Sequence, residues 1–432
     1  QNAAMIAALR ERLPLVHFDV LTQSAWFEAW GTALLTQDQP LHKSPQTTIQ
    51  STLGNLPPLM QRADQVRIIP SAPRQLPPAY PLILGVDAGS TTTKMAILDP
   101  ETRSIVSTHY TRTRGDPIRA IRECLQALLH STGDVPVALI GTTGSARELA
   151  GAYLSTEHVY NEISAHAAGA AHFDPEVDTI FEIGGQDAKY IFLRNVVPVD
   201  YAMNNACSAG TGSFLEESAR SDLNIAVTDI AETALSASSP ASFKATCAAF
   251  INSDIRIAQQ QGYSRESIVA GLVYAIADNY LNRVKGQRPV GSKIFLQGGV
   301  ALNHAVGYAF AHAVGRPVII PPDPELMGAM GVALITADRA GAGKSVIRRL
   351  SELGNADMKL VGQFTCGACK LYCRIDRFEV GGRRFPFGGR CSLYENVWKR
   401  KTRVTPSPDL VEERAGILFE HKATSVSAVM KT

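Results

Sequence analysis

The sequence has no strong excess of charge of either sign and no apolar run long enough to span a membrane. Lys and Arg number 42 against 40 Asp and Glu, so the formal net charge of the 432 residues is only +2. This balance excludes a general binder of nucleic acids or of membrane surfaces. Apolar runs are interrupted well before the ~20 residues that a transmembrane helix requires. A secretory signal pattern is missing too, so we expect a cytoplasmic protein.

Cysteine is scarce, and its number does not suit a disulfide framework. Seven cysteines occur, which is an odd number in a long chain. In a cytoplasmic protein, clustered cysteines more often bind metal or carry out redox chemistry. The G-x-x-x-x-G-K-[ST] pattern of P-loop proteins is also absent, so any phosphate site must be built in another way.

The length and the 45% hydrophobic content predict two or three domains with a substantial core. Nine of the 24 prolines fall within residues 40–81, and this density predicts an irregular linker over residues 39–81. Helical patterns then alternate with β-rich runs, which predicts an α/β domain over residues 82–345. A small module rich in Cys and Gly follows at residues 355–400, and residues 401–432 form a C-terminal extension.

Residues 1–38 resemble a part of the chain 300 positions later. The matching residues are Ala29, Gly31, Ala33, Leu34 and Thr36, which recur as Ala329, Gly331, Ala333, Leu334 and Thr336. Alanine-rich helices can match by chance, but we favour the interpretation that residues 1–38 are the tail of a preceding copy of the same domain. The first residue is Gln rather than Met, so we expect a fragment of a longer protein with two copies.

Three segments of the α/β domain combine a predicted strand end with a glycine turn. They are Gly85–Lys94, Phe181–Asp187 and Leu296–Asn303. Backbone N–H groups at such turns can approach phosphate oxygens closely, and the acid at the strand end can hold Mg²⁺ through water. We predict three catalytic carboxylates: Asp87, Glu182 and Asp187.

The three segments, in this order, fit the actin-like ATPase and sugar-kinase superfamily, in which two lobes close over a nucleotide. The alternative is that each glycine pair simply turns the chain. The first interpretation predicts an ATP site made of these residues: Gly89, Ser90, Thr91, Thr92, Lys94, Gly184, Gly185, Gln186, Gly298, Gly299, Asn303 and Gly328.

Two cysteines lie between the second and third glycine segments. Cys207 precedes a predicted helix start that contains glycine, and Cys247 begins a second short motif that ends at Asp254. Helix N–H groups can stabilise a thiolate or the charge of a metal cluster. Taken alone, each cysteine is more typical of a small buried apolar residue.

With these segments in place, residues 82–340 resemble the activator ATPases of 2-hydroxyacyl-CoA dehydratases and benzoyl-CoA reductases. The shared motifs include the G-x-D-x-G-S-T-T-T-K pattern, an E-I-S-x-H-x-x-G-A segment at Glu162–Ala170, and the motifs around both cysteines. One departure is Glu182, because the family usually has Asp at that position. The additional methylene group shifts the carboxylate from the place expected in the family.

The resemblance implies an ATPase that works under anaerobic conditions and passes a low-potential electron to its partner. It implies Mg²⁺ and one 4Fe–4S cluster shared by two activator domains, with Cys207 and Cys247 as the ligands from each domain. It also implies a CoA-ester dehydratase or reductase as partner and ferredoxin or flavodoxin as electron donor. Two alternatives remain. A small-molecule kinase of the same superfamily would leave both cysteines without a role, and a scaffold could use nucleotide only to set its conformation.

The C-terminal module contains four cysteines within 26 residues: Cys366, Cys369, Cys373 and Cys391. Four thiolates suit either tetrahedral Zn²⁺ or a 4Fe–4S cluster, whereas free thiols are the alternative. Longer members of the activator family carry a segment similar to Gly388–Asn396, which favours iron–sulfur. We therefore predict a second metal site here, more consistent with iron–sulfur than with zinc.

Overall fold

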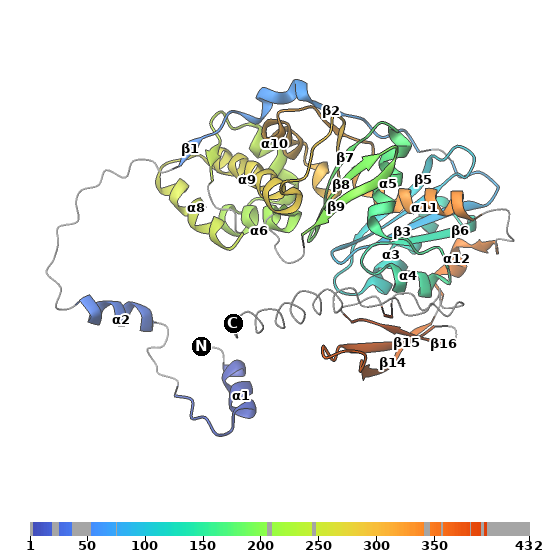
Figure 1. Ribbon diagram of the computed structural model, residues 1–432, viewed down its shortest axis with the longest axis horizontal. Helices are drawn as coiled ribbons and strands as arrows, with labels where there is room; N and C mark the ends of the chain where they lie inside the picture. The colour runs from blue at the N-terminus through green and yellow to red at the C-terminus, as the bar shows by residue number, and fades with distance from the viewer. Residues whose placement is uncertain are drawn as a thin grey trace, which may run out of the picture. The chain divides into compact units, whose positions relative to one another are not determined.

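The computed structural model describes residues 3–19, 26–36, 53–74, 76–204, 210–243, 248–340, 346–355, 357–380, 382–389 and 393–394. The chain divides into two compact units, Gln1–Thr52 and Leu53–Thr432. The described part of the first unit contains two helices, α1 (Ala3–Arg12) and α2 (Phe27–Thr36). The described part of the second unit contains four β-sheets and the other helices (Figure 1).

The first lobe is built on a five-stranded sheet, and we call this sheet with its helices lobe I. A meander of three antiparallel strands forms one side, and β6 continues the sheet parallel to β3. The strands in spatial order are β13 (Arg348–Arg349), β6 (Pro136–Thr143), β3 (Leu82–Ala88), β4 (Thr92–Leu98) and β5 (Ile105–Arg112). The helices are α3 (Pro117–Thr132), α4 (Arg147–Leu154) and α12 (Leu350–Leu353). All residues of β3 are buried, as expected for a central strand with a continuous apolar run.

The second lobe repeats this plan on a six-stranded sheet, and we call it lobe II. Its meander begins with β7, and β11 runs parallel to β7 on the other side. The strands in order are β2 (Val66–Ile68), β12 (Val318–Ile320), β11 (Ile294–Gln297), β7 (Thr179–Ile183), β8 (Ala188–Arg194) and β9 (Val197–Met203). The helices are α6 (Gly212–Leu223), α7 (Ile230–Leu235), α8 (Ala248–Gln260), α9 (Arg265–Asn279) and α10 (His304–Val314).

Smaller elements complete lobe II. A two-stranded sheet pairs β1 (Gly54–Asn55) with β10 (Ala241–Ser242). The short helical turns are η2 (Leu59–Gln65), η4 (Val227–Asp229), η5 (Tyr280–Lys285), η6 (Gly299–Leu302) and η7 (Pro324–Leu326).

Two further helices, α5 (Glu162–Phe173) and α11 (Met327–Arg339), connect the lobes. Helix α11 packs on β3, β4 and β6 of lobe I, whereas α5 packs on β8 and β9 of lobe II. The two helices cross closely, because Gly331 lies against the backbone of Ala165 and leaves no room for a side chain. The same holds at Gly169, where an added Cβ would lie 2.6 Å from the carbonyl oxygen of Met327.

The structure corrects the predicted linker at residues 39–81. Strand β2 is an integral edge strand of lobe II, and Leu59 of η2 is buried in its core. The prolines do not prevent this, because no proline lies between Pro58, which precedes η2, and Pro70, which follows β2. Residues 39–52 lie outside the described residues.

The C-terminal module forms a separate antiparallel sheet of three strands, β14 (Met358–Thr365), β15 (Arg374–Val380) and β16 (Arg383–Phe387). Val380 and Phe385 pack against Ala152 of α4. The predicted two-lobed α/β fold is thus confirmed, while residues 401–432 lie outside the described part. Every helix among the described residues is too short or too polar to cross a membrane.

Candidate functional site

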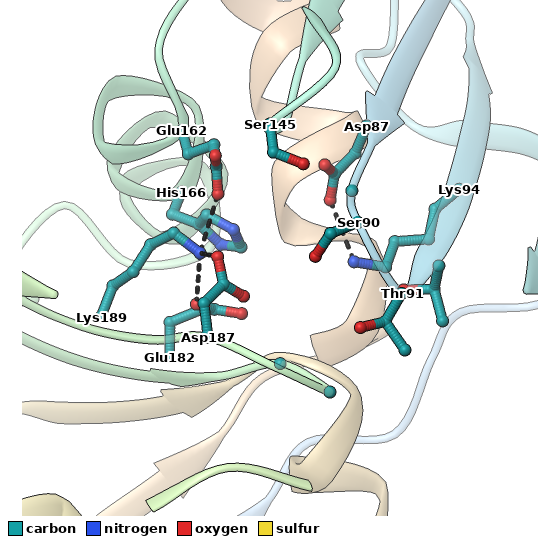
Figure 2. A pocket seen from close by; sticks show the side chains of 14 residues that line it. Asp87, Ser90, Thr91, Lys94, Ser145, Glu162, His166, Glu182, Asp187 and Lys189 are labelled. Carbon is teal, nitrogen blue, oxygen red and sulfur yellow. Dashed lines mark hydrogen bonds and ion pairs between the residues drawn. The ribbon is translucent and has the colours of Figure 1, made fainter. Parts of the chain in front are cut away.

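One pocket collects side chains from both lobes (Figure 2). Lobe I contributes the turn between β3 and β4 and Ser145, which lies two residues after the end of β6. Lobe II contributes the loop between β7 and β8, and α5 contributes its first turns. The lining residues are Asp87, Gly89, Ser90, Thr91, Thr92, Lys94, Ser145, Glu162, His166, Glu182, Gly184, Gly185, Asp187 and Lys189.

The two meanders present equivalent acid–lysine pairs to this pocket. In lobe I, Asp87 lies opposite Lys94 in the β3–β4 register, and Lys94 Nζ is 3.1 Å from Asp87 Oδ2. In lobe II, Glu182 lies opposite Lys189 in the β7–β8 register, and Lys189 Nζ is 3.1 Å from Glu182 Oε2. Each lobe therefore supplies one buried carboxylate with its counter-ion.

Lys189 has two further carboxylate partners. Its Nζ lies 2.9 Å from Asp187 Oδ2 and 2.8 Å from Glu162 Oε2. Glu162 is the first residue of α5, whose N-terminus is capped by the side chain of Asn161. Lys189 thus joins the β7–β8 loop to the start of α5, as the dashed lines in Figure 2 show.

Burial and neighbouring charges shift the pKa values of the two strand-end acids in opposite directions. Burial alone would raise the pKa of Asp87, but Lys94, together with His166 and Lys189, outweighs it and holds this pKa below its ordinary value. Burial raises the pKa of Glu182, and Lys189 offsets only part of that increase. Glu182 is therefore the more basic carboxylate and the better proton acceptor, whereas Asp87 stays ionised.

The other buried groups of the pocket have shifted pKa values too. Burial would lower the pKa of Lys189, but Glu182, Glu162 and Asp187 raise it well above its ordinary value. Burial, reinforced by Lys189, lowers the pKa of His166 to about 4. The ammonium of Lys189 is hence charged at neutral pH, and the imidazole of His166 is neutral.

The turns of the two lobes come close together in a way that suits phosphate oxygens. A Cβ added to Gly185 would lie 2.7 Å from Thr91 Cγ2, so the β7–β8 loop needs glycine at this position. The hydroxyl of Thr91 is buried and has no hydrogen-bond partner among the described residues. An unsatisfied donor beside glycine backbone is what a bound phosphate would complete.

Most of the predicted site residues line the pocket, and some do not. Gly298 and Gly328 lie behind it, because an added Cβ would meet Glu182 Oε1 at 2.8 Å or Asp87 Oδ2 at 2.7 Å. Asn303 instead caps α10, where its Oδ1 accepts a hydrogen bond from Ala305 N at 3.1 Å. Gln186 and Gly299 are also outside the lining residues.

Four lining residues were missed by the prediction: Ser145, Glu162, His166 and Lys189. Glu162 and His166 stand in the E-I-S-x-H segment, and Ser145 follows a glycine at the end of β6. The signal for Lys189 is a spacing. Each strand-end acid is followed seven residues later by a lysine, and in a short hairpin these two positions face each other.

Cys207, Cys247 and Cys391 lie outside the described residues. Helix α6 begins soon after Cys207, with Thr211 as N-cap residue, and α8 begins directly after Cys247. The helices α6 and α8 contact each other in lobe II. The two cysteine positions therefore precede the N-termini of two neighbouring helices.

The described cysteines of the C-terminal module lie at the β14–β15 connection. Cys366 N donates a hydrogen bond to Cys373 O at 2.8 Å, and Ala368 N donates to Cys366 Sγ at 3.5 Å. The Ala368 N–H and the Tyr394 O–H, both bonded to this sulfur, lower the pKa of Cys366. Cys369 is exposed. Among the residues with described positions, no three His, Cys, Asp or Glu side chains form a metal group.

Comparison with known proteins gives consistent matches to the two-lobed part. The model of the BadF/BadG/BcrA/BcrD ATPase family matches residues 84–336. The (R)-2-hydroxyglutaryl-CoA dehydratase activating ATPase of Acidaminococcus fermentans is 31% identical over 60% of this chain and 97% of its own length. The activator of lactoyl-CoA dehydratase of Anaerotignum propionicum is 31% identical over 60% and 98%.

Solved structures agree with these sequence matches. The activator of 2-hydroxyisocaproyl-CoA dehydratase from Clostridium difficile with bound ADPNP superposes with a TM-score of 0.55 and 31% identity, over 60% of this chain and 95% of the other. Component A of the Acidaminococcus fermentans (R)-2-hydroxyglutaryl-CoA dehydratase gives a TM-score of 0.54 at 28% identity, over 60% and 99%.

Proposed function

The chain belongs to the BadF/BadG/BcrA/BcrD ATPase family, and on this premise we propose that it is an ATP-hydrolysing electron donor that activates a CoA-ester dehydratase or reductase. The observation that carries this proposal is the pocket in which each lobe presents a buried acid–lysine pair beside a glycine turn. The relatives named as activators of CoA-ester dehydratases support the kind of partner.

The pocket residues have different roles in hydrolysis. The N–H groups of the two turns and the hydroxyls of Ser90 and Thr91 bind phosphate oxygens. Asp87, held ionised by Lys94, would hold Mg²⁺ through water, and the ion would neutralise charge on the triphosphate. Glu182, with Asp187 beside it, orients the attacking water and accepts its proton. The new P–O bond forms to water as the bond to ADP breaks.

The redox half of the proposal rests on Cys207 and Cys247. Two thiolates from each of two activator domains make the Cys₄ set of a 4Fe–4S cluster. Both cysteines precede neighbouring helices in the chain, Cys247 directly and Cys207 by a few residues, and this supports the proposal because helix N-termini stabilise the negative charge of thiolates. The cluster would hold the low-potential electron that ferredoxin or flavodoxin supplies.

The crossing of α5 and α11 offers the coupling between nucleotide and cluster. Helix α5 carries Glu162 and His166 into the pocket and packs on lobe II, whereas α11 packs on lobe I. Loss of the γ-phosphate removes contacts that both turns share, and the angle between the lobes can then change. Cluster-bearing lobe II would move with respect to lobe I.

Helix α2 supports a second activator copy as partner. It coincides with the segment at Ala29–Thr36, which recurs in α11. Gly331 of α11 packs against Ala165 of α5, but its counterpart Gly31 has no atom within 4 Å of an added Cβ among the described residues. We propose that α2 corresponds to α11 in a preceding copy of the domain. The helix face that contains Gly31 would then pack against another copy of α5.

The C-terminal cysteines are proposed to hold a second metal site, iron–sulfur rather than zinc. The donor set of four thiols suits either, and the N–H bond to Cys366 Sγ stabilises a thiolate. Cys366 and Cys373 lie at the same end of the β14–β15 hairpin. The sheet is small, so ligation would contribute much of its folding free energy.

A phosphate-release assay combined with an iron and sulfide assay on anaerobically purified protein tests the proposed function. An activator releases phosphate from Mg·ATP without an added acceptor and contains iron with sulfide. Hydrolysis only with an added small-molecule acceptor would indicate a kinase. Nucleotide binding without turnover would indicate a scaffold.

A further inference from the structure

Lys189 stands out among the pocket residues because one ammonium group meets three carboxylates. Its Nζ lies 3.1 Å from Glu182, 2.9 Å from Asp187 and 2.8 Å from Glu162, and its side chain is only 2% exposed. Asp187 is the most exposed of the three acids, at 37%. Its position therefore depends on the lysine more than on surrounding side chains.

The three carboxylates belong to three parts of the fold. Glu182 is the second-last residue of β7, Asp187 lies in the β7–β8 loop, and Glu162 begins α5. Lys189 itself is fixed on β8, and its backbone carbonyl accepts a hydrogen bond from Tyr280 Oη at 2.7 Å. One rigidly held side chain thus connects the loop that carries the predicted catalytic acids to a helix that crosses between the lobes.

The comparison with Lys94 shows what is special about Lys189. Lys94 occupies the same place in lobe I and pairs with one carboxylate, Asp87. Four carboxylates line the pocket, namely Asp87, Glu162, Glu182 and Asp187, and among the described lining residues the ammonium groups are those of Lys94 and Lys189. Three of the four therefore depend on Lys189 for compensation.

We propose that Lys189 is a positioning residue for ATP hydrolysis, which holds the carboxylates of Glu182 and Asp187 toward the phosphate turns and ties them to Glu162 of α5. This role rests on the proposed ATPase function and deepens it. The lysine acts through the carboxylates, so its loss affects turnover more than nucleotide binding. Lys189 also favours the ionised form of Glu182, because it opposes the effect of burial on that carboxyl group.

The charged groups that face Glu182 determine the direction of the pH effect. They are Lys189 and Asp187 of the same meander, Lys94 and Asp87 of lobe I, and Glu162 and His166 of α5. Burial already raises the pKa of Glu182, and Lys189 is the largest opposing influence. Removal of Lys189 raises this pKa further, so the acid limb of kcat moves to higher pH.

The experiment compares the wild-type chain with Lys189→Met, with the double variant Lys189→Met/Glu162→Gln, and with Lys293→Met as matched control. Lys293 also pairs with two carboxylates, Asp174 at 2.7 Å and Glu176 at 2.8 Å, but it lies at the surface. Phosphate release is measured against ATP concentration and pH, binding is measured with a fluorescent ATP analogue, and thermal unfolding reports on folding.

We expect Lys189→Met to lower kcat by about 10²-fold, to change KM by less than about tenfold, and to move the acid limb upward. The double variant removes one unpaired carboxylate and regains thermal stability, but its kcat stays low. Lys293→Met behaves as the wild type. If Lys189→Met fails to fold, the double variant provides the same test.

Two results would overturn the proposal for Lys189. One is a Lys189→Met chain with the kcat and pH profile of the wild type. The other is a double variant that recovers wild-type kcat, since the lysine would then only compensate charge. If the wild-type chain itself releases no phosphate from Mg·ATP, this result refutes the proposed ATPase function, and the proposed role of Lys189 is refuted with it.

Discussion

Lys94 and Lys189 occupy equivalent positions in the two lobes: each faces the acid that ends or nearly ends the first strand of its meander, at 3.1 Å. The two pairs differ in their acid, Asp87 in lobe I and Glu182 in lobe II. The pKa shifts of the two acids also have opposite directions: the pKa of Asp87 is lowered, and that of Glu182 is raised. The same arrangement thus gives lobe I an acid with a lowered pKa and lobe II a more basic acid.

Gly185→Val should weaken nucleotide binding without unfolding either lobe. The added Cβ would meet Thr91 Cγ2 at 2.7 Å and force the two phosphate turns apart. We expect the Kd for a fluorescent ATP analogue to rise roughly tenfold or more, which corresponds to about 1.4 kcal/mol. The control is Gly362→Val in β14, where an added Cβ has nothing within 4 Å. Equal affinities of wild type and Gly185→Val would contradict the turn as phosphate site.

His166 should make the protein sensitive to mild acid. Its pKa is about 4 when folded, below the ordinary 6.5, so the folded state favours the neutral ring. This contribution is complete above pH 6.5 and is lost as the pH falls toward 4, up to about 3 kcal/mol of unfolding free energy. Denaturant unfolding at several pH values should show a smaller loss for His166→Gln, whereas the exposed His130→Gln should match the wild type. The same pH dependence in all three proteins would refute this.

Cys207→Ser should remove the cluster that we propose between two activator domains. Iron and sulfide per chain should fall, and the association of the domains should weaken, as measured by sedimentation under anaerobic conditions. Cys124→Ala is the matched control, because Cys124 is buried in lobe I and burial raises its pKa to about 12. Unchanged iron in Cys207→Ser would count decisively against this ligand.

The C-terminal site can be tested in the Cys207→Ser background. We expect residual metal there, which is lost when Cys366 is replaced too, while nucleotide binding by the two lobes persists. Elemental analysis with a sulfide assay identifies the metal. Iron with sulfide supports the proposal, zinc alone refutes the choice of iron–sulfur, and the absence of residual metal removes the site.

The sequence predicted the local parts of the site better than the way in which the two lobes bring them together. The apolar runs and glycine turns predict β3, β4 and the phosphate turns, because these depend on neighbouring residues. The contact of Gly185 with Thr91 depends on how two lobes pack, and no local pattern encodes it. The ion pair of Lys189 with Glu162 was missed because Glu162 comes from a different element. Strand β2 was missed because nearby prolines outweighed its short apolar pattern.

Phosphate release from Mg·ATP by the wild-type chain, compared with Asp87→Asn, tests the central claim most directly. Asparagine keeps the shape of Asp87, but it lacks the negative charge that pairs with Lys94. We predict Mg²⁺-dependent, saturable release that falls by about 10²-fold or more in Asp87→Asn, with less than about tenfold loss of analogue binding. Asp338→Asn, in an exposed pair with Arg103, should retain full activity. Equal turnover by wild type and Asp87→Asn, or none by the wild type, would contradict the account.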